Sequence, residues 1–225
     1  MKGTLHLILG TPDSGRRSIL SHANTPESPQ AGSHFLLPEE LKDQTIPHSC
    51  WRWEEEEFRF SGSEPASPAE FFLFFSNNFD LADQFEASLS LLSSETELEL
   101  GRIIVFLNSR LLVQADSSIT EWIDGAAHFA DALCFTHREN DNASEIAKCK
   151  ERFESMRYPL ETYVLGKKKA PPLERILFPS ARRISHAFDP QDLLEPEDSP
   201  QNDTYLARQP NGKRQRPIPR PFASR

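Results

Sequence analysis

The opening stretch constrains this chain most, because a short apolar segment is followed there by two spaced glycines. Leu5–Leu9 is apolar apart from one histidine and predicts a buried strand. Gly10 and Gly15 follow with four residues between them, and Arg16 begins a segment that can form a helix. This is the layout of a phosphate-binding loop, in which glycines let backbone amides turn toward an anion at a helix N-terminus.

Two positions depart from the loop pattern G-x-x-x-x-G-K-S/T. Arg16 stands where the pattern has Lys, and Arg17 stands where it has Ser or Thr. Arg binds phosphate as a planar fork, but Arg17 offers no oxygen to Mg²⁺. Ser18 has a hydroxyl, yet one residue further on it points about 100° away around a helix. The predicted phosphate-binding residues are Gly10, Thr11, Pro12, Asp13, Ser14, Gly15, Arg16, Arg17 and Ser18. A plain strand–turn–helix corner is the alternative.

Composition excludes several classes of protein. The net charge of −9 and pI of about 5.3 argue against a nucleic-acid footprint over the whole surface. Cys50, Cys134 and Cys149 lack C-x-x-C spacing, which argues against a disulfide scaffold and a cysteine zinc site. No apolar run is long enough to span a membrane, and the first residues do not resemble a signal peptide. We therefore expect a cytoplasmic protein that makes no membrane contact.

Segments typical of strands alternate with segments typical of helices along residues 1–166, which predicts a mainly parallel sheet covered by helices. The expected strands are Leu5–Leu9, Phe71–Phe75, Ile103–Leu107, Ala132–Phe135 and Leu160–Leu165. The expected helices are Arg16–His22, Asp80–Leu92, Ser118–Phe129 and Asn142–Met156, with Asp80 as a cap. Ligands bind beyond the carboxyl ends of parallel strands. The loops expected to matter are therefore Gly10–Arg17, Ser76–Asp80, Asn108–Arg110 and Thr136–Asn140.

Other segments gave weaker signals. Ser49–Phe60 has aromatic residues at period two and predicts one or two exposed strands, interrupted by the acidic run Glu54–Glu57. That run could attract a cation, but a solvated edge is the commoner outcome. Leu36–Lys42 is short and acidic, with no assigned element, and Leu111–Gln114 reads as a short continuation of the preceding strand.

The composition changes after residue 166. We predict an α/β domain over 1–166, a linker with a short element over 167–188, and a disordered, Pro-rich basic tail over 189–225. The tail could contact nucleic acid or another acidic partner. A solubilising role is favoured, because it has too few aromatic residues for base stacking, and a nucleic-acid partner is not expected.

Three further segments are similar to motifs of one family. Phe71–Phe75 is followed by Leu81-Ala82-Asp83, Ile103–Leu107 is followed by Asn108, and Ala130-Asp131 precedes an apolar strand and Thr136–Glu139. Together with Gly10–Ser18, these segments resemble the CobW/UreG/HypB group of P-loop GTPases over about Lys2 to Leu165. The resemblance implies a P-loop NTPase-like three-layer α/β fold. It also implies that Glu139 contacts a guanine base.

The departures from that family fall on its functional positions. Asn77 stands in place of a strand-end acidic residue, and the guanine-reading Asn, Lys and Asp become Thr136, His137 and Glu139. The Cys-x-Cys-Cys metal motif is absent. The resemblance therefore implies a diverged nucleotide-binding protein that takes GTP or ATP, with weak or no hydrolysis and without the usual Mg²⁺ anchors. The alternative is a non-catalytic pseudo-GTPase scaffold that binds a protein partner.

Overall fold

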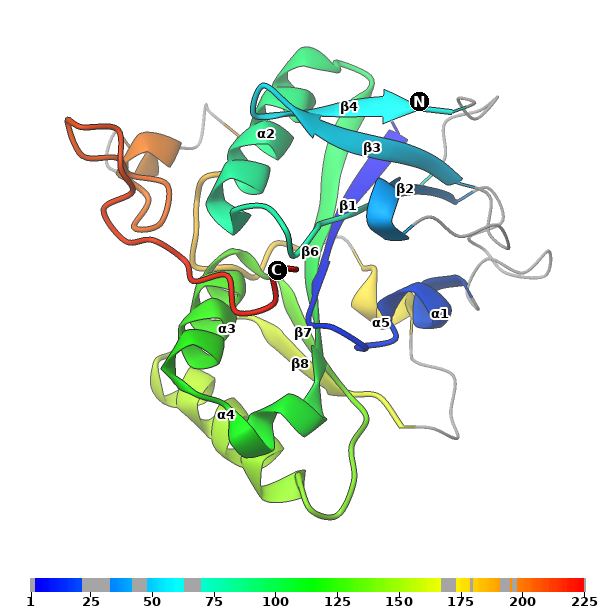
Figure 1. The fold of residues 1–225 in the computed structure, drawn as a ribbon, viewed down its shortest axis with the longest axis vertical. Coiled ribbons are helices and arrows are strands. Elements are labelled where there is room, and N and C mark those ends of the chain that lie inside the picture. The colour runs from blue at the N-terminus through cyan, green and yellow to red at the C-terminus, as the bar shows by residue number, and fades with distance from the viewer. Residues whose placement is uncertain are drawn as a thin grey trace.

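A central eight-stranded sheet organises the chain (Figure 1). The computed structural model describes residues 3–21, 33–41, 48–62, 70–166, 173–178, 180–190, 195 and 198–224. Its strands are β1 (Gly3–Gly10), β2 (His34–Pro38), β3 (His48–Glu54), β4 (Glu57–Ser61), β5 (Glu70–Phe74), β6 (Leu98–Asn108), β7 (Ala132–Thr136) and β8 (Glu161–Val164). The strand order is β4-β3-β2-β5-β1-β6-β7-β8, and β3–β4 is the antiparallel pair among the described strands. The predicted linker residues 167–172 lie outside the described part.

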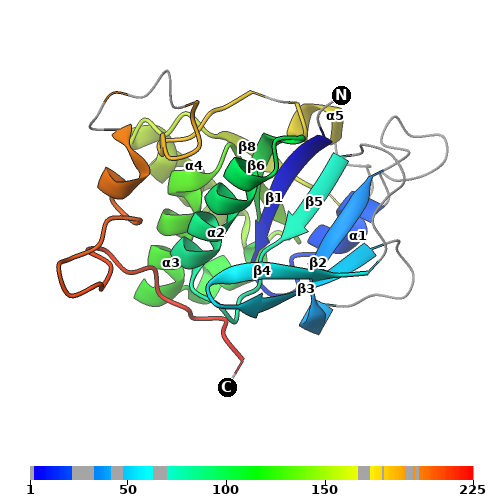
Figure 2. The ribbon, with the colours of Figure 1, turned by 90° about the horizontal axis from the view of Figure 1, so that it is seen from above.

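Helices cover both faces of this sheet, as predicted for a three-layer α/β fold (Figures 1 and 2). The helices are α1 (Arg16–Ser21), α2 (Leu81–Ser94), α3 (Ser117–Phe129), α4 (Ala143–Ser155) and α5 (Leu173–Ile176). α2, α3 and α4 lie on one face, and α1 and α5 lie on the other. Short 3₁₀ helices span Glu39–Leu41, Ser109–Gln114 and Pro200–Asn202.

β1 shows why the sheet forms two cores. Leu5, Leu7 and Leu9 belong to the larger core on the α2–α3 face, whereas Ile8 belongs to the smaller core on the α1 face. Successive side chains of a strand point to opposite faces, so a continuous apolar run suits a strand that is covered on both sides. β1 pairs in parallel with β5 and β6, which places its carboxyl end near the middle of one sheet edge.

Three details of the fold correct the sequence-based expectations. β2 overlaps Leu36–Lys42, the segment with no assigned element, and Ser109–Gln114 forms a 3₁₀ helix instead of continuing β6. The Asn108 side chain accepts a hydrogen bond from the Arg110 amide at 3.2 Å, which favours a helical turn there. In the β3–β4 hairpin, Trp51 and Phe58 are buried against the α2-side core instead of exposed.

The C-terminal segment differs most from expectation. Residues 198–224 cross the outer side of the α2–α3 layer (Figure 2), where a disordered tail was predicted from residue 189. Ile218 is buried against Gly125 of α3, where an added Cβ would lie 2.8 Å from the Ile218 side chain. The absence of a side chain at Gly125 therefore lets the segment pack closely on the helix. No helix in the described residues has the length and apolarity to cross a bilayer.

Candidate functional site

The predicted phosphate loop connects the end of β1 to α1. The Thr11 amide donates to the Phe106 carbonyl at 3.0 Å, and Thr11 Oγ1 accepts from the Asn108 amide at 2.8 Å. These bonds fix the start of the loop to the end of β6. Asp13 and Gly15 have φ of 53° and 71°, so the loop makes a tight left-handed bend before α1 begins. The loop is thus held by its neighbours at the carboxyl edge of the sheet.

The Arg16 side chain is buried against the ends of β1 and β5. Its Nη2 donates to the Phe75 carbonyl at 3.0 Å and its Nη1 to the Ile8 carbonyl at 3.4 Å. Burial lowers the pKa of the Arg16 guanidinium to about 10, so it stays charged at neutral pH. An added Cβ on Gly10 would come within 2.9 Å of Arg16 Cδ. Gly10 therefore gives the arginine room to cross the strand end.

A cavity of about 540 Å³ opens in front of the loop. This volume lies within the range of small-molecule sites. The lining residues come from the loop, from the ends of β2, β5 and β7, and from the C-terminal segment. They are Thr11, Pro12, Asp13, Ser14, Gly15, Arg16, Arg17, Glu40, Leu41, Asn77, Asn78, His137, Phe222 and Ser224.

Residues that follow β2 and β5 form one wall of the cavity and are joined by hydrogen bonds. Asn77, which stands where the resembled family has a strand-end acidic residue, donates from Nδ2 to the Gly10 carbonyl at 3.2 Å. The Ser76 hydroxyl donates to the Glu40 carboxylate, and the Arg17 guanidinium donates to the Leu41 carbonyl at 2.6 Å. These contacts join the loop, β2 and β5 around one cavity.

The predicted base-reading residues lie in two places. His137 Nε2 donates to the Asp13 carbonyl at 2.8 Å, so the end of β7 is tied to the phosphate loop. The Glu139 carboxylate forms an ion pair with Arg110, and Glu139 is not among the residues that line the cavity. Ser18 is exposed on α1 and also lies outside the lining. Of the predicted residues, Thr11–Arg17 face the cavity, and Gly10 borders a smaller neighbouring hollow with Arg16.

Four lining residues were not predicted. Glu40 and Leu41 follow β2, whose five residues lack the alternation that marks a strand in a sequence. Phe222 and Ser224 belong to the segment that composition marked as a tail. Asn77, Asn78 and His137 lie in loops that the strand ends had already indicated.

The phosphate-loop pattern implies a Mg²⁺ ion, and the residues present do not fit the usual site. The guanidinium of Arg17 replaces the hydroxyl ligand and is bonded to a carbonyl. Asn77 replaces the strand-end carboxylate and uses its amide nitrogen on Gly10. Among the described residues, no group of three or more His, Cys, Asp or Glu side chains is arranged to hold a metal ion. We therefore derive no step through Mg²⁺.

Comparison with known proteins supports the architecture. No protein-family model matches the sequence, and no curated protein matches it at a significant level. Among solved structures, the zinc-bound YjiA GTPase from E. coli matches with a TM-score of 0.52 and 12% identity. A zinc-bound triple mutant of YjiA matches with a TM-score of 0.51 and 13% identity. Each match covers 80% of this chain and 62% of the YjiA chain. The chain therefore shares with these structures the P-loop NTPase-like α/β fold that the sequence resemblance implied.

Proposed function

We propose that this chain is a diverged P-loop protein that binds the phosphates of GTP or ATP at the Gly10–Ser18 corner. The observation that carries the proposal is that the loop lines a cavity of about 540 Å³ at the carboxyl edge of a P-loop GTPase fold. The amides of the loop would hold the phosphates, together with the charge of Arg17.

The charges around the cavity are compatible with this role. Arg16 and Arg17 bring positive charge to its lining, and Asp13 and Glu40 bring negative charge. Arg16 contributes its charge from within the sheet edge, because its donors already engage two carbonyl groups. Arg17 is half-buried, and its Nη1 donates to the Leu41 carbonyl. We assign the direct phosphate contact to Arg17 and the loop amides, with Glu139 as the proposed base contact.

Hydrolysis is proposed to be weak or absent. Phosphoryl transfer in P-loop enzymes depends on a metal ion that bridges the outer phosphates. The chain has Arg17 and Asn77 at the two positions that usually anchor that ion. Three free cysteines suit a reducing compartment, and we propose the cytoplasm as the place of action.

Titration with fluorescent GTP and ATP analogues tests the proposal. The unmodified chain should bind at least one of them saturably. Arg17→Glu should weaken binding at least about tenfold, which corresponds to about 1.4 kcal/mol, because it places a negative charge in the loop. Lys148→Glu is the matched control, since Lys148 is exposed on α4 away from the cavity. Thermal unfolding of both variants checks that each is folded.

Two results would contradict this function. The first is no binding at millimolar nucleotide, and the second is equal binding by Arg17→Glu and the unmodified chain. Phosphate release in the same samples should stay at background with and without Mg²⁺. Absence of nucleotide binding would instead favour the alternative of a pseudo-GTPase scaffold with a protein partner.

A further inference from the structure

The C-terminal segment, residues 203–224, reaches the candidate nucleotide site from the outside of the α2–α3 layer (Figures 1 and 2). Its basic residues would be solvated if it were a free tail. Instead, Arg208 and Arg214 contact acidic residues of α2. This contact gives the segment a defined path along the domain.

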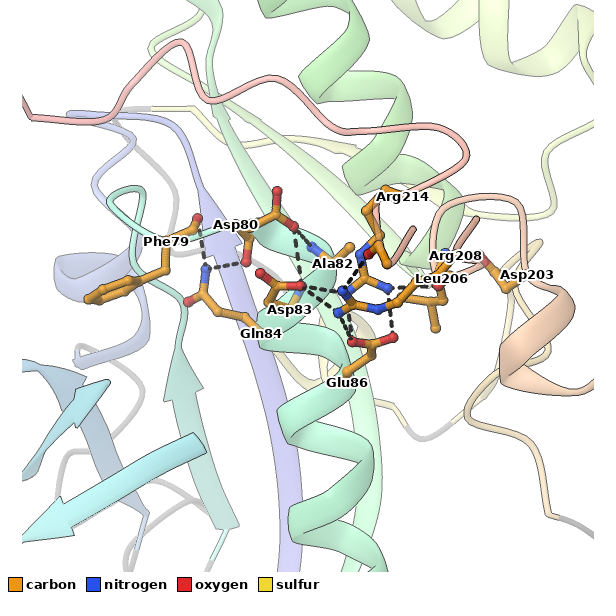
Figure 3. Close-up of polar contacts among 11 residues, drawn as sticks. Phe79, Asp80, Ala82, Asp83, Gln84, Glu86, Asp203, Leu206, Arg208 and Arg214 are labelled. Carbon is orange, nitrogen blue, oxygen red and sulfur yellow. Dashed lines mark hydrogen bonds and ion pairs between the residues drawn. The ribbon is translucent and has the colours of Figure 1, made fainter. Parts of the chain in front are cut away.

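Figure 3 shows the clasp that holds the segment, formed by Asp83, Glu86, Arg208 and Arg214. Both nitrogens at the end of Arg214 contact the Glu86 carboxylate at 2.6 Å, in a bidentate pair. Arg208 adds a bond to Glu86 at 2.7 Å. The Arg214 side chain is only 7% exposed and also donates to the Leu206 carbonyl at 2.7 Å. The clasp therefore attaches the segment to α2 through two of its arginines.

Between the clasp and the site, the segment packs on α3 through apolar contacts. Ile218 packs on Gly125 in the middle of α3. Four residues later, the Phe222 ring lies edge-on to Trp122, with 5.3 Å between the ring centroids. These contacts bring the last described residues to the carboxyl edge of the sheet.

At that edge the segment becomes part of the cavity wall. The Arg220 guanidinium donates to the Asn78 carbonyl at 3.2 Å, and the Ser224 amide donates to Asn78 Oδ1 at 2.9 Å. Phe222 and Ser224 line the same cavity as the phosphate loop. The cavity measures about 540 Å³ with the segment in place, so the segment lines the cavity without filling it.

We propose that residues 220–224 are a working part of the nucleotide site, with Phe222 and Ser224 as binding residues supplied by the C-terminal segment. This inference rests on the proposed function and extends it. The segment lines the cavity beside Asn78, and Arg220 adds a positive charge to the smaller neighbouring hollow that Gly10 and Arg16 also line. Arg214 acts as a positioning residue, because it holds the segment on α2 without touching the cavity.

Two variants test the contribution of the segment, with a fluorescent GTP analogue as the probe. A chain that ends at Pro219 keeps Ile218 on α3 and removes the wall residues. This chain and Phe222→Ala should each weaken binding about tenfold, since each removes enclosing contacts. Phe178→Ala is the matched control, because Phe178 is 64% exposed and lies outside the cavity. It should bind like the unmodified chain.

The positioning role of Arg214 needs a separate readout. Arg214→Ala should weaken binding in the full chain but have no additional effect in the chain that ends at Pro219. Residues that act through one another give such non-additive effects. Additive losses would overturn the positioning role.

Two further outcomes separate this inference from the proposed function. Binding by the full chain with equal or tighter binding by the shortened chain would overturn the inference alone. Failure of the full chain to bind would overturn both.

Discussion

Arg16 shows how one substitution can keep a fold and alter its site. The position belongs to a phosphate-contacting lysine in the usual loop. Here the longer, forked side chain reaches back to the ends of β1 and β5 and bonds to two carbonyl groups. The guanidinium also lies 5.7 Å from the centroid of the Phe74 ring. The residue is part of the sheet edge, and we propose Arg17, which donates to the Leu41 carbonyl from the loop, as the contact for phosphate.

Arg16→Ala should therefore affect stability more than a surface substitution would. It removes the Arg16 donor from the buried Phe75 carbonyl, while the Ile8 carbonyl keeps the Phe75 amide at 2.9 Å, and it opens a gap behind the loop. We expect the free energy of unfolding to fall by about 2 kcal/mol. Arg16→Lys should lose less, because an ammonium group can still reach one of the carbonyls. Denaturant unfolding of the three proteins measures this, and an unchanged midpoint for Arg16→Ala would show that the buried contacts contribute little.

At the scale of elements, α2 connects the site with the C-terminal segment. Asp80 caps the helix as the sequence predicted, accepting from the Ala82 amide at 2.9 Å. The loop before this cap carries Asn77 and Asn78 into the cavity wall. The next turn carries Asp83 and Glu86, which hold Arg208 and Arg214. One helix thus positions residues that are more than a hundred positions apart in the sequence.

Asp203 gives the attachment of the segment a pH dependence. Burial opposes its charge, but hydrogen bonds from His128 at 2.8 Å and from Ser185 outweigh this and hold the Asp203 pKa below its usual value. Its contribution to stability is therefore fully present above about pH 4, the ordinary value for an aspartate, and is lost as the pH falls through the lowered pKa.

Asp203→Asn should lower the free energy of unfolding by about 1–2 kcal/mol at pH 7. The difference between variant and unmodified chain should shrink below about pH 4, because protonation removes the same charge from the unmodified chain. Chemical unfolding at pH 7 and at acid pH measures both values. A difference that stays constant with pH would contradict the role assigned to the Asp203 charge.

At the scale of the whole molecule, local patterns predicted the sheet and most of its helices. Runs such as Ile103–Leu107 and the capped start of α2 carry enough local signal to identify an element. β2 carried too little signal, because it is short and its pairing with β3 and β5 is visible only in three dimensions.

Part of the candidate site was also predictable from local sequence signals. Loop glycines and strand ends indicated Thr11–Arg17 and the wall at Asn77. The position of Phe222 depends on the ion pairs that hold Arg214 to α2, which is distant in the sequence, and on the absence of a side chain at Gly125. Composition alone predicted a free tail there, because prolines and basic residues look alike whether or not acidic partners lie opposite them.

The central claim is that the corner between β1 and α1 holds the phosphates of a nucleotide. A crystal structure of the full chain grown with a non-hydrolysable GTP analogue tests this claim most directly. We expect the phosphates to lie against the amides of residues 13–17, with Phe222 in contact with the ligand. A nucleotide bound elsewhere on the molecule, with no ligand at the loop, would contradict phosphate binding at this corner.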